Sequence, residues 1–148
     1  MSATLGAEGV PPSATPPPPD GPVQPAGWMK PRGYSNGYVV GGTLFVAGQI
    51  AWTPAQELVG RGDFGVQFDQ ALGNVRAVLD AAACPPERVG RVTVYVTDKH
   101  AYLAALPAVG AAWRRHFGRH YPAMALVQVA DLLEDGAMVE IEATAVLP

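Results

Sequence analysis

The sequence predicts an α+β domain: a mostly antiparallel sheet with two helices on one face. Three observations predict it. Apolar and polar residues alternate along several short stretches, which is the period of a half-buried strand. Two longer stretches repeat apolar residues at helical spacing. The expected order is strand, strand, helix, strand, helix, strand, strand, and 148 residues are enough for one such domain with its own core.

The N-terminal segment differs in composition from the rest of the chain. It is rich in Pro, Ala, Gly and Ser and holds few side chains that could build a core. We therefore expect residues 1 to 30 to be a disordered tail, with Trp28 near its end pinning it to the domain. The run from Pro16 to Pro19 could be a polyproline ligand, or part of a plain extension. Residues 31 to 148 are expected to form the folded domain.

A hairpin and a helix open this domain. Two strands are expected over residues 38 to 50, joined by Gly41 and Gly42, which suit a two-residue turn. Asp63 is a candidate N-cap, and apolar residues follow it at helical spacing. This pattern predicts an amphipathic helix over residues 63 to 83.

The second half of the domain repeats the two periods. Residues 92 to 97 alternate Val with Thr and Tyr and predict a strand. Pro107 suits the first turn of a second helix, which is expected to end near Phe117 because Gly118 follows. The strands expected to complete the sheet are residues 123 to 130 and 137 to 147.

Alternation divides the last two strands between a face under the helices and an open face. The residues expected under the helices are Ala125, Val127, Val129, Val139, Ile141, Ala143 and Ala145. The residues expected on the open face are Met124, Leu126, Gln128, Met138, Glu140, Glu142 and Thr144. Nothing left in the sequence could cover that open face, so we expect it to pack against copies of the same chain, with a ligand site at the seam.

Composition argues against several other classes of protein. The chain has 13 acidic and 10 basic residues, so we expect no nucleic-acid partner. No apolar run is long enough to span a bilayer and no signal peptide is evident, so we expect no membrane contact and a cytoplasmic location. Neither the single cysteine, Cys84, nor the histidines show metal-ligand spacing, so we expect no metal and no cofactor.

Five stretches carry a resemblance to a known family. They are FVAGQI (45 to 50), NVRAVLDAAA (74 to 83), VTVYVTD (92 to 98), YPAMALVQVA (121 to 130) and GAMVEIEATAV (136 to 146). In this order they resemble the RidA/YjgF family of small trimeric proteins, often called enamine/imine deaminases. The resemblance implies a chorismate-mutase-like homotrimer with a ligand pocket at each subunit interface. It also implies hydrolysis of 2-imino acids to 2-keto acids and ammonia.

The family's site residues carry over in part. In active members an arginine in a PARS-type motif grips the substrate carboxylate, while a tyrosine, backbone groups and a glutamate position a water. The resemblance assigns the tyrosine to Tyr34 and the glutamate to Glu140, and Gly48 and Gln49 keep the family's Gly-Gln pair. The arginine position holds Met124.

Four further positions depart in the same apolar direction. The family's two serines, its cysteine and its asparagine align with Ala47, Ala125, Leu126 and Leu106. A charge-assisted bidentate pair is lost, and no replacement is evident in the sequence. These changes predict a ligand whose recognised group is not a small carboxylate, or an abandoned site.

Glu140 is the candidate acid/base. In an interface cleft beside Met124 and Leu126 its pKa should be raised by desolvation, which suits work on a water or an enamine carbon. The alternative is that Glu140 and Glu142 are exposed, or paired with Arg91 or with a basic residue of another subunit.

The other candidates each keep two interpretations. Tyr34 could donate its phenol proton to a ligand, or anchor the first strand by its ring. Met124 and Leu126 could line a ligand wall or pack the trimer seam, and Gln128 could orient a ligand or satisfy a strand neighbour.

Two classes of function remain open. The first is a diverged imine or enamine hydrolase, or a tautomerase, with Glu140 as acid/base and Tyr34 as orienter. The second is a non-catalytic trimer that binds a small molecule or plays a regulatory role. Endoribonuclease activity, a label also attached to the family, fits poorly with the acidic balance.

Overall fold

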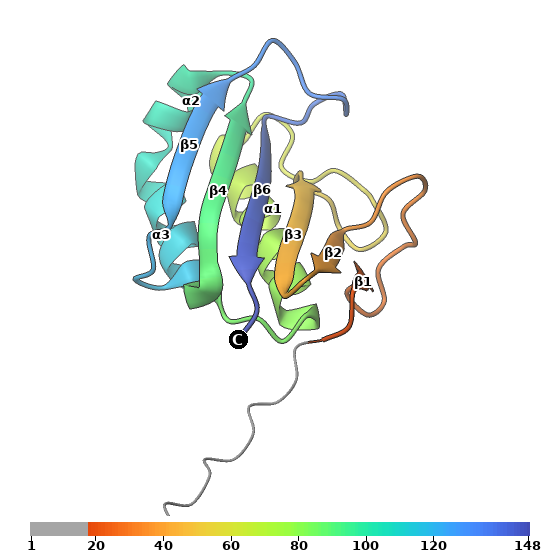
Figure 1. Cartoon of the computed structure of the whole chain (residues 1–148). Helices are drawn as coiled ribbons and strands as arrows, with labels where there is room; N and C mark the ends of the chain where they lie inside the picture. The colour runs from red at the N-terminus through yellow and green to blue at the C-terminus, as the bar shows by residue number, and fades with distance from the viewer. Residues whose placement is uncertain (1–17) are drawn as a thin grey trace, which may run out of the picture.

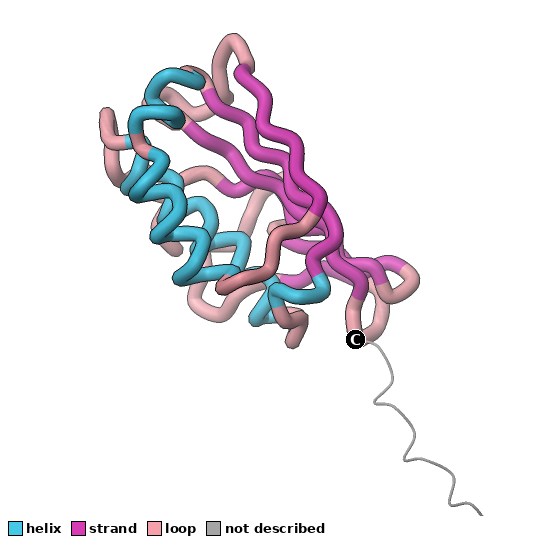
Figure 2. The backbone as a smooth tube through the Cα atoms, turned by 90° about the vertical axis from the view of Figure 1, so that its left-hand side faces the viewer, coloured by secondary structure: helices cyan, strands magenta, loops and turns pink. Residues whose placement is uncertain are grey.

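The computed structural model describes residues 18–148; residues 1–17, part of the expected tail, lie outside the described part (Figure 1). The strands are β1 (Gly21–Val23), β2 (Gly37–Val40), β3 (Thr43–Gln49), β4 (Val89–Val96), β5 (Ala123–Gln128) and β6 (Val139–Val146). They form one six-stranded sheet in the order β1-β2-β3-β6-β4-β5. Every neighbouring pair is antiparallel except β4 and β5. The helices cover one face and leave the other open, which confirms the predicted architecture (Figure 2).

The N-terminal edge of the sheet was not expected. The composition placed residues 21 to 23 in the tail, but the structure pairs them with β2 as strand β1. A strand of three residues with Pro22 at its centre carries no readable periodicity, and such a proline is tolerated because β1 is an edge strand. Next to β1, the Gln24 side chain accepts a hydrogen bond from Asn36 at 3.0 Å. The folded part therefore begins before residue 31.

The hairpin and the first helix form as predicted. Gly41 and Gly42 join β2 to β3 with φ of +56° and +78°, a pair of left-handed conformations that glycine adopts without strain. Helix α1 (Phe64–Ala81) follows. The Asp63 side chain accepts a hydrogen bond from the Val66 amide at 3.1 Å and so caps the helix.

The connection from β4 to β5 holds one helix more than predicted. Helix α2 (Lys99–Ala104) precedes α3 (Leu106–Phe117), and the short 3₁₀ helix η1 (Pro86–Arg88) precedes β4. The Asp98 side chain caps α2 by accepting a hydrogen bond from the His100 amide at 2.8 Å. Six residues are too few for a visible helical period, so the cap was the only signal. Gly118 ends α3 with φ of +60°, as expected.

Strand β5 faces the opposite way from the prediction. In the parallel register Val92 pairs with Met124 and Val94 with Leu126, and both valines are fully buried under the helices. Met124, Leu126 and Gln128 therefore lie on the helix side, whereas Ala125 and Val127 lie on the open side. The assignment was wrong because β5 is apolar on both faces, so alternation alone could not orient it. For β6 the prediction is confirmed: Val139, Ile141, Ala143 and Ala145 are buried in the core.

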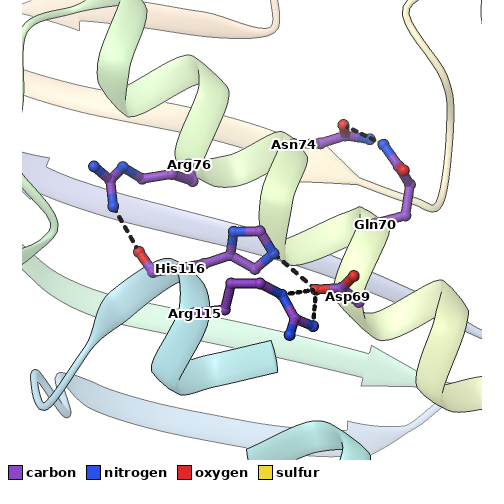
Figure 3. Close-up of polar contacts among 6 residues, drawn as sticks. All are labelled: Asp69, Gln70, Asn74, Arg76, Arg115 and His116. Carbon is purple, nitrogen blue, oxygen red and sulfur yellow. Dashed lines mark hydrogen bonds and ion pairs between the residues drawn. The ribbon is translucent and has the colours of Figure 1, made fainter. Parts of the chain in front are cut away.

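Polar contacts lock the two main helices together on their outer side (Figure 3). Asp69 of α1 accepts hydrogen bonds from Arg115 Nη2 at 2.7 Å and pairs with His116 Nε2 at 2.8 Å. Burial raises the pKa of Asp69, but the bonds from Arg115 and His116 outweigh it and hold that pKa below its usual value. Arg76 of α1 donates to the His116 carbonyl at 2.8 Å. These contacts fix α3 on α1 and so fix the groove between α3 and β5.

Candidate functional site

Glu140 lies on the open face of β6, beside an irregularity in β3. The register between β3 and β6 shifts between Val46 and Gln49. This shift brings Gly48 against the Glu140 side chain: a Cβ on Gly48 would lie 2.8 Å from the carboxyl carbon. Only a residue without a side chain lets the carboxylate occupy this position.

The Glu140 carboxyl is half-buried. Burial raises its pKa, and the neighbouring Glu142 carboxylate raises it further. The contacts formed within residues 18–148 include no ion pair and no hydrogen bond to its carboxyl oxygens. Met124 and Leu126, expected to desolvate it, lie on the other side of the sheet. Glu140 is therefore a half-buried acid whose protonation state is not fixed by a partner in its own chain.

Glu142 differs from Glu140 although both lie on the same face. Its Oε1 accepts a hydrogen bond from the Tyr95 hydroxyl at 2.8 Å. That bond, with some burial, raises the pKa of Tyr95. Arg91 lines the same hollow as Glu142, but no ion pair joins them in the described part of the chain. Glu142 is thus held by Tyr95, whereas Glu140 is not.

A hollow of about 410 Å³ opens on this face beside Glu142. The residues that line it are Ser35, Tyr38, Phe45, Val46, Ala47, Arg91, Thr93, Glu142, Ala143 and Thr144. Around it, Tyr38, Phe45 and Val146 remain 45%, 49% and 55% exposed. An isolated chain rarely leaves such side chains together on one sheet face.

Tyr34 lies in a different hollow within the chain. It is 45% exposed, and the side chains around it include Lys30, Arg32 and Trp52. Burial raises the pKa of its phenol. The Trp52 indole nitrogen, also in this region, is buried and has no hydrogen-bond partner in the described part of the chain. The chain by itself does not place Tyr34 and Glu140 in one hollow, so the ligand-orienting role of Tyr34 stays a prediction.

Gln49, expected to contact a ligand, points into the core instead. It is 6% exposed, and its amide donates to Asn36 Oδ1 at 3.3 Å and to the Ala47 carbonyl at 3.1 Å. Asn36 in turn binds Gln24, so this chain of amides joins the irregular end of β3 to the N-terminal segment. In this chain Gln49 supports the backbone at Gly48.

Replacing Gln49 with Ala should therefore lower stability. The Oδ1 atom of the buried Asn36 would lose the hydrogen bond that the Gln49 amide donates, which costs about 1–3 kcal/mol. Chemical denaturation measures this loss, with Glu134→Ala as the control, because the Glu134 side chain is exposed. An unchanged unfolding free energy would contradict the structural role.

Met124 and Leu126 lie in an apolar groove between α3 and β5. The groove has a volume of about 270 Å³ and is lined by Phe68, Val94, Tyr102, Leu106, Val109, Gly110, Trp113, Tyr121, Met124 and Leu126. Three of the positions that depart from the family's polar residues, Leu106, Met124 and Leu126, thus meet in one place. No pattern in the sequence indicated that Gly110 and Trp113 line this groove, because their position in it depends on how α3 packs on β5.

Gln128 has a local structural partner. Its side-chain oxygen accepts a hydrogen bond from the Lys99 amide at 2.8 Å, at the first residue of α2. This contact matches the interpretation in which Gln128 satisfies a neighbour. The bond connects the end of β5 to the start of α2, the helix that precedes α3.

Glu140 and the groove are separate within one chain. They lie on opposite faces of the sheet, and β4 stands between β6 and β5. Two strand spacings alone amount to about 10 Å. A ligand that touches both therefore needs a second copy of the chain.

The described His, Cys, Asp and Glu residues form no group of three or more that could hold a metal ion. No described helix is both long and apolar enough to cross a bilayer.

Comparison with known proteins places this geometry in context. A family profile described as Endoribonuclease L-PSP matches residues 29–147. A RutC family protein of Synechocystis sp. is 38% identical over 117 residues, or 78% of this chain and 86% of that protein. The 2-iminobutanoate/2-iminopropanoate deaminase of Capra hircus is 34% identical over 113 residues, or 76% of this chain and 79% of the deaminase.

Solved structures agree with the sequence comparisons. The crystal structure of E. coli TdcF with bound serine superposes with a TM-score of 0.75 at 28% identity, over 86% of this chain and 99% of that chain. The YjgF gene product of E. coli gives a TM-score of 0.67 at 31% identity, over 76% of this chain and 87% of that chain.

Proposed function

The chain belongs to the Endoribonuclease L-PSP family, also called RidA/YjgF, and from that premise we propose that it is a diverged imine or enamine hydrolase. One observation carries the proposal: the half-buried Glu140 carboxyl, with its raised pKa, lies against Gly48 and has no hydrogen-bond or ion-pair partner among residues 18–148. A raised pKa makes this carboxyl better matched to general acid–base work than an ordinary exposed carboxylate. The curated deaminases among its relatives make imine hydrolysis the first reaction to test.

The proposed reaction is the addition of one water to a C=N bond. Glu140 as carboxylate takes a proton from the water while the water oxygen bonds to the carbon of the protonated imine. Glu140 then gives this proton to the nitrogen of the tetrahedral adduct. The C–N bond breaks, the adduct's hydroxyl proton passes to the carboxylate, and a carbonyl compound and ammonia leave, with ammonia taking up that proton. Tautomerisation of an enamine would use the same carboxyl.

We also propose that the working unit is a homotrimer with the ligand at its subunit interfaces. The apolar side chains on the open face and the separation of Glu140 from the groove support this arrangement. The edge strand β5 leaves one side of its backbone without a strand partner among the described residues. Neither nucleic acid, a membrane nor a cofactor enters the proposal, and we place the protein in the cytoplasm.

Replacing Phe45 with Glu should disperse the trimer. A charge at this position, 49% exposed on the open face of one chain, would be buried without a partner in the assembly. Analytical ultracentrifugation should show a trimer for the native protein and a monomer for the variant. Leu133→Glu is the matched control, because Leu133 is 103% exposed in the loop before β6. A native protein that sediments as a monomer would contradict the proposal.

A non-catalytic, ligand-binding trimer is the second candidate function. The observation that favours it is the apolar character of the groove where active relatives are expected to carry the arginine. Imine hydrolysis separates the two functions: the rate at which an imine released by a flavin oxidase disappears is measured by competition with semicarbazide. Native protein that accelerates neither a carboxylated nor an uncharged imine would favour the binding function.

A further inference from the structure

The groove between α3 and β5 has walls of one chemical kind. Leu106, Val109 and Trp113 form the helix side, and Leu126 and Met124 form the strand side. Tyr121, 71% exposed, stands at the rim. None of its lining residues carries a charge.

One polar group of the lining, the Trp113 indole, is already satisfied. The Trp113 indole nitrogen donates to the His120 carbonyl at 2.9 Å, and His120 Nε2 lies 2.7 Å from the Val89 carbonyl. The groove therefore offers no free indole donor to a ligand carboxylate. A carboxylate bound among these residues would lose its water and gain no ion pair from any of them, which is unfavourable; the Arg114 guanidinium lies outside the lining, beside Gly110.

The volume of the groove limits the size of the ligand group that it can hold. Cavities of about 150 Å³ lined by aliphatic and aromatic residues hold a benzene molecule. The groove, at about 270 Å³, has room for one ring and a short chain. Aromatic walls such as Trp113 favour a flat group, because rings gain from stacked and edge-on contacts.

We infer that this groove is the specificity pocket for an uncharged aromatic or branched aliphatic group on the ligand. For catalysis the inference rests on the proposed function: the pocket of one subunit would hold the ring while Glu140 of another acts on the imine. The expected substrates are imines of hydrophobic carbonyl compounds rather than of small 2-keto acids. For binding alone the inference does not need Glu140.

Gly110 offers a way to fill the groove without disturbing the core. It lines the groove from α3, and a Cβ added there would meet only the end of the Arg114 side chain, at 3.4 Å. Replacing a glycine inside a helix also removes a source of instability. Gly110→Leu should therefore fold and block the pocket. Ala104→Leu adds a similar bulk at an exposed position of α2 outside the groove and serves as the control.

The first measurement is the binding of indole, an uncharged flat probe, followed by saturation-transfer NMR. Native protein and Ala104→Leu should bind it with similar affinity, and Gly110→Leu should bind at least about 10-fold more weakly. Binding that is absent, or equal in all three proteins, overturns the inference. Binding confined to the dispersed Phe45→Glu chain also overturns it, because a neighbouring subunit would then fill the groove.

The second measurement compares hydrolysis of the imines of benzaldehyde and acetaldehyde. Native protein should favour the benzaldehyde imine by at least about 10-fold in kcat/KM, and Gly110→Leu should remove this preference while acetaldehyde imine turnover continues. If both imines are hydrolysed equally in native protein and variant, the inference fails and the proposed function stands. If neither imine is hydrolysed but a carboxylated imine is, the proposed function stands and the inference fails. If no imine of either kind is hydrolysed, the proposed function fails, and the indole result alone decides the inference.

Discussion

Replacing Glu140 with Gln should lower imine hydrolysis by about 10²–10⁴-fold, the usual loss when a general acid or base is removed. Gln keeps the shape of the side chain but cannot take a proton from water or return it to nitrogen. The fold should survive, because no hydrogen bond or ion pair of the described residues depends on this carboxyl. The measurement is kcat/KM by semicarbazide competition, on whichever imine the native protein hydrolyses fastest.

Glu142→Gln is the matched control for this change. It neutralises a carboxylate on the same strand and face, but one that accepts the Tyr95 hydroxyl bond at 2.8 Å and has no catalytic role in the proposal. It should keep most of the activity. If Glu142→Gln proves as damaging as Glu140→Gln, the effect belongs to the charge of the face and not to one acid/base.

Glu140→Gln should also change how the stability of the protein depends on pH. Since the folded protein raises the pKa of Glu140, the neutral form is favoured by folding, and this stability is fully present below the unfolded pKa. It is lost as pH rises through the folded pKa. Glu140→Gln should therefore match the native Tm in acid and exceed it at neutral pH. The rising limb of kcat/KM with pH should appear above the ordinary carboxyl range in native protein.

The sequence was most informative where one face of an element is polar. Strand β6 alternates buried apolar residues with Glu140 and Glu142, so its orientation was predictable. The start of helix α1 was likewise predictable, because Asp63 precedes a clear apolar stripe. In both cases local chemistry and tertiary environment agree.

The sequence was least informative where an element is apolar on both faces or too short for a period. Strand β5 packs Leu126 against α3 on one face and carries Val127 on the open face. Because both side chains are apolar, the sequence was compatible with either face of β5 lying under the helices. The orientation is set by the parallel pairing with β4, which is a long-range contact. That reversal moved Met124 from the Glu140 face to the groove, and it is why the proposed site requires two copies of the chain.

The contact between Gly48 and Glu140 could not be predicted from the sequence either. It is the basis of the second large expected effect. Gly48→Ala should lower activity by about 10²-fold, a typical result of displacing a catalytic group by about 1 Å. The new Cβ would lie 2.8 Å from the Glu140 carboxyl carbon and 3.0 Å from its Cγ, so the side chain must move. Because the φ of Gly48 is not positive and the atoms nearest the new Cβ all belong to the flexible Glu140 side chain, stability should change little.

Gly90→Ala is the control for this change, since Gly90 lies in β4 of the same sheet with nothing within 4 Å of the added Cβ. The two changes at the contact should not be additive. Once Gln has replaced Glu140, adding Gly48→Ala should cost little more, because the group that it displaces no longer moves a proton. A double variant far worse than Glu140→Gln alone would mean that the Gly48 backbone binds the ligand directly. Full activity in Gly48→Ala, together with a required Glu140, would mean that the carboxylate acts from a different position.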